Sequence, residues 1–560
     1  MKVAGVVATR ILGVLLSAAL ATTTSSPARR ERLALRHVEL DLPGPPSKVI
    51  PWDLDGDGRL DLVVVVAYTE IDEVTEERVE EMIEIVTVIP AAFDRREVRA
   101  YLAGPDGTYE LAGPAMELAP SVLHLEAGPA GIGIVALTDE GLSRLRLDIS
   151  GDVPVLSLEA LIEDPPVLAR TRSFYATLEL VHDLNGDGIR DVMIPSRNGL
   201  AVYLGTKSGI ENAPSHRVAL PAEVPAFGDS IRAWYPLPDV RDIDGDAIAD
   251  LVFSSGLEAG GAARIDAMLG SPTGVFRPLR ATKRDCHDRL SDVRVAVEGA
   301  DLYPWPENLV AVLDLDGSGR AEAVFGVERS RGDGMGKELK DAKRPIQDYS
   351  FHRLDDDLTI AAAPYFETEI VGHTMDSGDI DEDLPLWIRQ FEDLDGDGRQ
   401  DLITVTLDFS LFQVVRILVT KSISIGIDFH VYRQGADGRF EEVSGLDLSE
   451  KLKFDLENLE LGRFAQFAGD FDGDGRRDFV HLGRGKVVTI HTGQPGCRYP
   501  RNPDLAIELD EEPAGLDLIR VEDLDGDGRS DLRVTRPLPA GDPDETAPVR
   551  VDLYLSGNGP

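Results

Sequence analysis

The sequence predicts an all-β fold: a single β-propeller of four-stranded antiparallel blades, with eight blades favoured over seven. Three observations support this prediction. A nine-residue acidic pattern recurs seven times along the 560 residues. Each copy runs into a short apolar stretch, and a glycine turn and another extended stretch usually follow. Hydrophobic residues make up 42% of the chain and are spread along it, which is enough apolar material for a packed core.

The acidic pattern places oxygen-bearing side chains at positions 1, 3, 5 and 9 of a loop and, in six copies, glycine at position 6. From copy to copy, positions 1, 3, 5 and 9 are Asp53, Asp55, Asp57 and Asp61; Asp183, Asn185, Asp187 and Asp191; Asp242, Asp244, Asp246 and Asp250; Asp314, Asp316, Ser318 and Glu322; Asp393, Asp395, Asp397 and Asp401; Asp470, Asp472, Asp474 and Asp478; and Asp523, Asp525, Asp527 and Asp531. Position 7 is occupied in turn by Arg59, Ile189, Ile248, Arg320, Arg399, Arg476 and Arg529.

This spacing predicts calcium loops. Side-chain oxygens at positions 1, 3, 5 and 9, together with the backbone carbonyl of position 7, form the hard oxygen shell that Ca²⁺ prefers, and glycine at position 6 permits the sharp turn. Without a cation, the crowded carboxylates would repel one another in the folded state. One such loop could be a solvated turn, but seven copies with fixed spacing favour up to seven bound Ca²⁺ ions.

The residues after each loop distinguish this pattern from other calcium folds. An EF-hand or dockerin loop carries a carboxylate at position 12 and continues into a helix. Here the loops run into β-rich stretches such as 62–66, 402–405 and 479–482, which have no acidic residue at position 12. The loops therefore join strands, and strand, loop, strand, turn, strand, turn, strand describes one blade.

In these features the units resemble the FG-GAP/VCBS repeats of integrin α-subunit-type β-propellers. The resemblance covers essentially residues 33–560, and its most specific element is the Asp-x-Asp-x-Asp-Gly-x-x-Asp loop. It implies that the loop joins the first two strands of a blade and binds Ca²⁺. The Phe-Gly and Gly-Ala-Pro signatures of the family are mostly absent, which places the chain closer to the bacterial VCBS form, and no inserted metal-dependent adhesion domain is found.

The spacing of the loops predicts the blade count. The gap between the loops that start at 53 and 183 is about twice the others. Within it, residues 134–145 parallel residues 192–203, whereas residues 126–131 occupy the loop position without its carboxylates. We therefore expect a degenerate blade near 120–165 that keeps its strands without an ion. If this stretch were only an insertion, seven blades would remain.

The two ends of the propeller are expected to meet. After the last loop the chain is one strand short of a blade, whereas residues 33–42 form a spare strand before the first loop. Pairing this strand into the last blade would close the ring and remove two exposed sheet edges.

The segments outside the blades carry separate predictions. Residues 1–21 have a basic start, a short apolar run and an Ala-Leu-Ala end, as in a secretory signal peptide, and the run is too short for a membrane anchor. Residues 22–32 are expected to be a flexible leader, and an insertion is expected near 327–350. The mature protein is therefore expected to be secreted, periplasmic or at the cell surface.

The loops should differ in affinity. Ala247 replaces the turn glycine of one loop, Ser318 and Glu322 alter two ligands of another, and Asn185 removes a charge from a third. We expect the loops starting at 53, 393, 470 and 523 to bind most tightly.

Charge and motifs restrict the function. With 57 basic and 100 acidic residues the formal net charge is −43, which disfavours nucleic acid and anionic membranes as partners. Two cysteines, Cys286 and Cys497, exclude a disulfide framework but allow one bridge or two separate thiols. The tripeptide Arg331-Gly332-Asp333 is expected from composition alone, and no catalytic motif is found.

Three functions remain in order of preference. The first is a calcium-stabilised module that binds or adheres to an extracellular protein or glycan, of unknown identity. The second is a structural subunit of a cell-surface assembly, and the third is a polysaccharide lyase or glycosidase on a propeller scaffold. Because folds do not determine function, the sequence does not choose among them.

Overall fold

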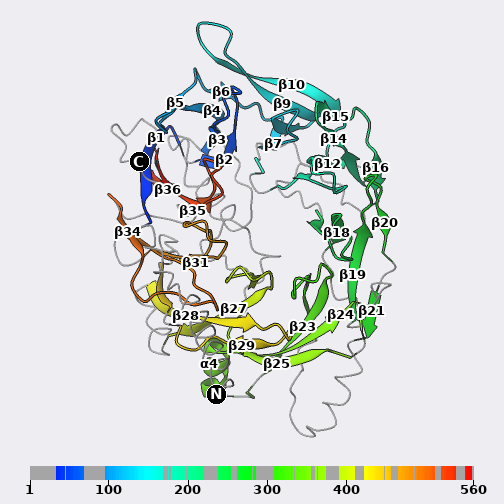
Figure 1. The fold of residues 1–560 in the computed structure, drawn as a ribbon, viewed down its shortest axis with the longest axis vertical. Coiled ribbons are helices and arrows are strands. Elements are labelled where there is room, and N and C mark those ends of the chain that lie inside the picture. Colours follow the sequence, from blue (N-terminus) through cyan, green and yellow to red (C-terminus); the bar gives the residue numbers. More distant parts are fainter. Residues whose placement is uncertain are drawn as a thin grey trace, which may run out of the picture.

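In the computed structural model the chain forms a ring of eight β-sheets around a central axis (Figure 1). The structure describes residues 33–44, 46–68, 95–167, 174–175, 178–196, 199–219, 237–253, 262–279, 282–285, 308–329, 331–332, 334–354, 360–361, 363–373, 390–409, 422–446, 448–455, 465–482, 486–510, 519–537 and 549–557. The predicted signal peptide and leader, residues 1–32, lie outside these ranges.

Each sheet is a four-stranded antiparallel blade, which confirms the predicted fold class and the count of eight. In chain order the first seven blades are β2 (Pro46–Trp52), β3 (Asp61–Tyr68), β4 (Arg95–Ala103) and β5 (Tyr109–Leu111); β7 (Val122–Ala127), β8 (Ile134–Thr138), β9 (Gly141–Asp148) and β10 (Val155–Glu163); β11 (Val181–His182), β12 (Asp191–Ser196), β13 (Gly199–Tyr203) and β16 (His216–Val218); β17 (Asp239–Arg241), β18 (Asp250–Phe253), β19 (Ala262–Leu269) and β20 (Arg277–Pro278); β22 (Asn308–Leu313), β23 (Glu322–Arg329), β24 (Ile346–Arg353) and β25 (Phe366–Val371); β26 (Phe391–Glu392), β27 (Asp401–Asp408), β28 (Ser422–Gln434) and β29 (Phe440–Glu442); and β31 (Ala465–Phe467), β32 (Phe479–Leu482), β33 (Val487–His491) and β34 (Leu505–Glu508).

Short strands extend some blades. β6 (Met116–Glu117), β21 (Thr282–Asp285) and β30 (Ser449–Asp455) pair with the third strands β4, β19 and β28, and β14 (Gly205–Thr206) pairs with β15 (Gly209–Ile210) in a small hairpin.

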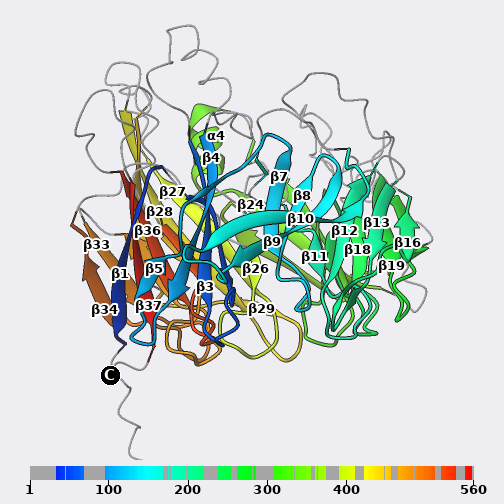
Figure 2. The ribbon, with the colours of Figure 1, turned by 90° about the horizontal axis from the view of Figure 1, so that it is seen from above.

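The eighth blade joins the two ends of the described chain, as predicted. It contains β35 (Ile519–Glu522), β36 (Asp531–Pro537), β37 (Val549–Ser556) and, as its outer strand, β1 (Leu35–Leu42). β1 and β37 are antiparallel and pair from Leu35 opposite Ser556 to Leu42 opposite Val549. In Figure 2 the blue β1 lies next to the red β37. The last blade therefore closes the ring.

The predicted degenerate blade is present as β7 to β10 and has no acidic loop between its first two strands. Gly128 donates a backbone hydrogen bond to the carbonyl of Gly133 at 2.8 Å and so closes the β7–β8 turn without side-chain oxygens. A blade of this propeller can thus form without the carboxylates.

The core lies between blades, and the second strand of a blade contributes to both of its faces. Residues 62–66 of β3 are at most 1% exposed. Val63 and Val65 pack toward the β7–β10 blade, whereas Leu62, Val64 and Val66 pack toward the closing blade. Because successive side chains of a strand point to opposite faces, a continuous apolar run is needed wherever both faces are covered.

The connection between β23 and β24, within the stretch assigned to an insertion, contains the helix α4 (Met335–Lys343). The sequence analysis did not predict a helix here. Arg331 donates a backbone hydrogen bond to Asp341 Oδ2 at 2.9 Å and its guanidinium pairs with the same carboxylate, while Asp333 lies outside the described residues. The arginine of the Arg-Gly-Asp tripeptide is therefore engaged within the chain.

Cys497 is a buried free thiol, and Cys286 lies outside the described residues. Within the part of the chain that the structure describes, no helix is both long and apolar enough to cross a membrane.

Candidate functional site

The seven acidic loops occupy the same place in seven blades. Each connects the first strand to the second: β2 to β3, β11 to β12, β17 to β18, β22 to β23, β26 to β27, β31 to β32 and β35 to β36. The loops therefore gather at one end of the ring (Figure 2).

The carboxylate at position 1 folds each loop around itself. Asp53 Oδ1 accepts hydrogen bonds from the backbone N–H groups of Gly56 at 2.8 Å and Asp57 at 3.1 Å, and its Oδ2 accepts from Gly58 at 3.0 Å. Equivalent bonds are made by Asp183, Asp242, Asp314, Asp393, Asp470 and Asp523. The loop conformation is thus encoded by the acidic residue itself.

The carboxylate at position 9 is buried and connects the loop to the blade. Asp478 is fully buried, and it accepts hydrogen bonds at 2.8 Å from the backbone N–H of Phe471, at position 2, and from that of Gly493, which follows β33. Asp61, Asp191, Asp250, Asp401 and Asp531 make the same pair of bonds. Glu322 accepts from Leu315 in the same way.

Burial and neighbouring carboxylates disfavour the charged form of these groups. Burial, reinforced by the other acids of the loop, raises the pKa of Asp191, Asp250 and Asp401 to about 6 and that of Glu322, Asp478 and Asp531 to about 7. A cation among the carboxylates would favour their charged forms. The electrostatics of the loops therefore suit a bound cation.

The oxygens of several loops are also close enough together to share one ion. Carboxylate oxygens of Asp53, Asp55 and Asp57 lie within 4.8 Å of one another. The same holds for Asp242, Asp244 and Asp246, and for Asp314, Asp316 and Glu322. Oxygen-only donor sets of this kind fit Ca²⁺ better than soft metals.

Neighbouring loops are joined around the ring by their backbones. The N–H at position 8 of one loop donates to the carbonyl at position 2 of the preceding loop, from Ala321 to Ile243 at 3.1 Å and from Gln400 to Leu315 at 2.8 Å. Arg477 donates to Leu394 in the same way at 3.1 Å. These bonds join the loops starting at 242, 314, 393 and 470 into a belt across adjacent blades.

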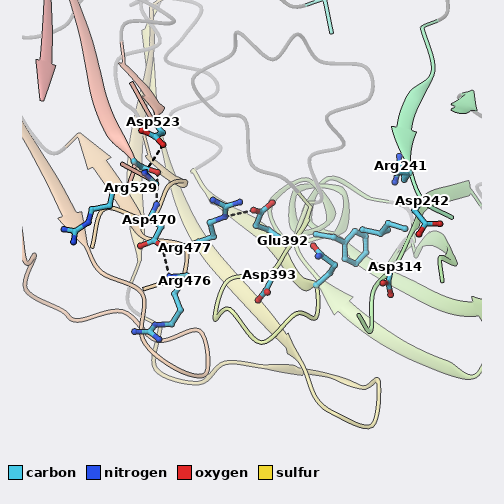
Figure 3. Close-up of a pocket in the computed structure, with 16 residues that line it drawn as sticks. Arg241, Asp242, Asp314, Glu392, Asp393, Asp470, Arg476, Arg477, Asp523 and Arg529 are labelled. Atoms are coloured by element: carbon cyan, nitrogen blue, oxygen red, sulfur yellow. Dashed lines mark hydrogen bonds and ion pairs between the residues drawn. The ribbon is translucent and has the colours of Figure 1, made fainter. Parts of the chain in front are cut away.

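A cavity of about 690 Å³ lies where five of the loops converge (Figure 3). Its wall includes Arg241, Glu392, Arg477 and the position-1 residues of these five loops. Arg477 Nε donates to Glu392 Oε1 at 2.6 Å. Arg241 lies on the opposite wall; its Nη1 donates to the carbonyl of Val312 at 2.5 Å, and its Nε is buried with no hydrogen-bond partner among the described residues. Burial lowers the pKa of Arg241 to about 10.

Comparison with protein families agrees with this geometry. A family model described as an FG-GAP-like repeat matches residues 183–253, which hold the loops starting at 183 and 242. This protein is a β-propeller with an FG-GAP-like repeat at residues 183–253. No curated protein matches the chain.

Solved structures resemble this propeller only distantly. A Lactobacillus plantarum protein is 8% identical, with 80% of this chain and 97% of that chain covered and a TM-score of 0.25. A putative 6-phosphogluconolactonase from Bacteroides uniformis is 14% identical, with coverages of 81% and 97% and a TM-score of 0.30. The family 117 glycoside hydrolase Zg3597 of Zobellia galactanivorans is 9% identical, with coverages of 57% and 84% and a TM-score of 0.21. Likeness at this level carries no conclusion about activity or ligand.

The altered loops of this propeller keep the common geometry. Ala247 has φ = 64°, the left-handed conformation that glycine adopts at position 6 elsewhere, as at Gly188 with φ = 81°. Ala247 therefore adopts a backbone conformation that a residue with a Cβ tolerates less well than glycine. Asn185 keeps an oxygen at position 3, and its Oδ1 accepts from the N–H of Asp187 at 3.0 Å.

The sequence analysis missed the side chain at position 7, for which it considered only the carbonyl. Arg59 Nε donates to the carbonyl of Ala103 at 2.8 Å, and Arg476 Nε donates to that of Gly493 at 3.1 Å. Both guanidinium groups also pair with the position-5 carboxylate of their own loop. The recurrence of arginine at position 7 was the available signal, because five of the seven loops share it.

Proposed function

We propose that this protein is a secreted calcium-binding propeller that acts as an interaction or adhesion module, with Ca²⁺ stabilising the blades. The observation that carries the calcium assignment is the repeated oxygen cluster, supported by buried position-9 carboxylates with raised pKa values. The ligands would be the side-chain oxygens at positions 1, 3, 5 and 9 and the carbonyl at position 7. A bound ion would supply positive charge to carboxylates that otherwise repel one another.

The cavity among the loops is the best candidate for partner binding. Its arginines lie beside position-1 carboxylates whose oxygens already accept hydrogen bonds from their own loops. The guanidinium of Arg241 also pairs with Asp239 and with the carbonyl of Val312, and its positive charge on the cavity wall favours an acceptor-rich ligand. We therefore propose that an extracellular protein or glycan presents a carboxylate or another oxygen acceptor to this cavity.

Screening the purified protein against glycan and extracellular-protein arrays, with Ca²⁺ and with chelator, tests this proposal. Binding should require Ca²⁺ and should weaken at least about tenfold in Arg241→Ala, because a hydrogen bond to a charged group contributes about 1.5–3 kcal/mol. Arg146→Ala is the matched control, since Arg146 is 58% exposed on β9, outside the cavity. Binding that is unchanged both in chelator and in Arg241→Ala would contradict the proposal. Turnover of a bound glycan would favour the enzyme alternative.

A further inference from the structure

One loop differs from the others because a cysteine of the next blade contacts it. The turn between β33 and β34 is closed by Gln494 and Arg498, whose backbones exchange hydrogen bonds of 2.9 and 3.3 Å. It lies against the 393–401 loop, where the N–H of Gly496 donates to Asp395 Oδ2 at 2.9 Å. The thiol of Cys497, 1% exposed, donates to Asp401 Oδ2 at 3.0 Å.

These contacts form a buried cluster of two carboxylates and one thiol. One oxygen each from Asp395 and Asp401 and the sulfur of Cys497 lie within 4.8 Å of one another. Asp395 is 9% exposed and Asp401 is 1% exposed. No other loop contains or adjoins a described cysteine, so the mixed oxygen and sulfur donor set occurs in this loop alone among the described residues.

The cluster has an unused donor atom. Asp395 Oδ2 accepts from Gly496 and from Arg433 Nε, the latter at 2.7 Å, whereas Asp395 Oδ1 is buried and has no hydrogen-bond partner among the described residues. A buried carboxylate oxygen without a donor is costly, and native structures usually satisfy such an atom with a donor, a water or an ion. This atom is therefore available as a ligand for an ion beside the thiol.

Donor type indicates the class of ion. The cluster combines two carboxylates with one sulfur, and Arg433, which pairs with both Asp395 and Asp397, is the cation beside it. A thiolate beside two carboxylates suits a borderline or soft cation better than Ca²⁺. We propose that Asp395, Asp401 and Cys497 form a thiolate-containing site for a thiophilic divalent cation of the Zn²⁺ or Cd²⁺ type.

Binding requires one proton to leave. The thiol proton, which now points at Asp401, would be released to solvent, and the sulfur would coordinate the ion as a thiolate. Asp401 would lose its hydrogen bond from the thiol and bind the ion instead.

The probe for this site is Cd²⁺, whose bond to thiolate produces an ultraviolet charge-transfer absorption. Cd²⁺ added to the full chain freed of Ca²⁺ by chelation should produce this band with one thiolate per protein, and Zn²⁺, but not Mg²⁺, should suppress it. Because Asp395 and Asp401 are also the calcium ligands proposed for this loop, Ca²⁺ in large excess should raise the Cd²⁺ concentration needed for the band. The band should vanish in Cys497→Ser and remain in Cys286→Ser, which is the matched cysteine control. Asp395→Asn should raise the half-saturating Cd²⁺ concentration at least about tenfold, whereas Asp55→Asn, at the same position of another loop, should leave it unchanged.

Three results would overturn the proposal: no band in the unaltered protein, a band that persists in Cys497→Ser, or a band that Asp395→Asn does not weaken. If Cys497→Ser fails to fold, Asp395→Asn and its control carry the test because both keep the thiol. The effect of Ca²⁺ on the melting temperature is measured separately without Cd²⁺. Failure of the general calcium proposal is therefore distinguishable from failure of this one.

Discussion

At the scale of single residues, the position-9 carboxylate stabilises the blade whether or not an ion is bound. Its two oxygens join the second residue of the loop to the end of the third strand, and it is at most 3% exposed in all seven loops. An aspartate that appears in the sequence only as a metal ligand is therefore also a buried hydrogen-bond acceptor.

Replacing Asp478 with alanine tests this role. The N–H groups of Phe471 and Gly493 would lose their acceptor, at a cost of about 1–3 kcal/mol each. Urea unfolding in chelator should show this loss of stability without a contribution from a lost calcium ligand. Asp152→Ala, at an exposed position, should change the free energy of unfolding by no more than about 0.5 kcal/mol. Equal stability of the two variants would contradict the assigned role.

The strained residue at position 6 offers a reciprocal experiment. Ala247→Gly should stabilise the protein by about 1 kcal/mol, because it relieves a left-handed alanine at φ = 64°. Gly188→Ala should destabilise by a similar amount, since a Cβ there meets no atom within 4 Å and only backbone strain is added. Thermal unfolding of both variants checks the pair, and shifts of the same sign would be inconsistent with backbone strain as the cause.

At the scale of elements, the loops contact one another closely as well as through hydrogen bonds. A Cβ at Gly317 would lie 2.4 Å from the carbonyl oxygen of Gly398 in the next loop. A Cβ at Gly398 would meet nothing within 4 Å, although both glycines have positive φ. Gly317, at position 4 of its loop, is therefore required by the neighbouring blade, and a single repeat does not reveal this requirement.

Gly317→Ala and Gly398→Ala separate close approach from backbone strain. Both substitutions add similar strain, but only the first creates an overlap with backbone, so Gly317→Ala should be less stable by about a further 1–3 kcal/mol. Chemical unfolding under matched Ca²⁺ concentrations measures the difference. Equal free energies of unfolding for the two variants would mean that the neighbouring loop shifts to accommodate the added Cβ.

The closing strand β1 provides the second prediction at this scale. Deleting residues 33–43 should lower the melting temperature and expose an edge of β37 that promotes association. Leu40→Asp, which places a charge at a 3% exposed position, should cost about 3 kcal/mol or more. Glu39→Ala, on the exposed face of β1, should change stability by less than about 1 kcal/mol. Calorimetry and light scattering would check all three, and an unchanged transition after the deletion would refute closure by β1.

At the scale of the whole molecule, the net charge of −43 predicts that stability depends on cations. Chelation should lower the melting temperature, because up to seven sites would lose an ion that binds only the folded loops. Readdition of Ca²⁺ should restore it, while Mg²⁺ at the same concentration should restore less. A transition that stays in place after verified metal removal would exclude a stabilising role for calcium.

Much of the architecture was predictable because each repeat carries it locally. The fixed loop spacing and the apolar stretches after the loops identify the blades, and the unpaired residues 33–42 identify the closing strand. The helix α4 and the role of Arg59 were missed, the former because a short helix between strands lacks a repeat signal. The contact of Cys497 with Asp401 joins residues of different blades, and no local pattern encodes it.

The pairing of Leu35 with Ser556 also sets the order in which this molecule can be completed. β37 is synthesised after every other strand. Until then β1 has no strand to pair with, although the first seven blades have already been synthesised. Folding of the ring is thus a late event that couples the first and last described strands over nearly the whole chain, which predicts slow closure. Because those strands are neighbours, a circular permutant that joins them through a short linker and opens the chain between two other blades should close faster.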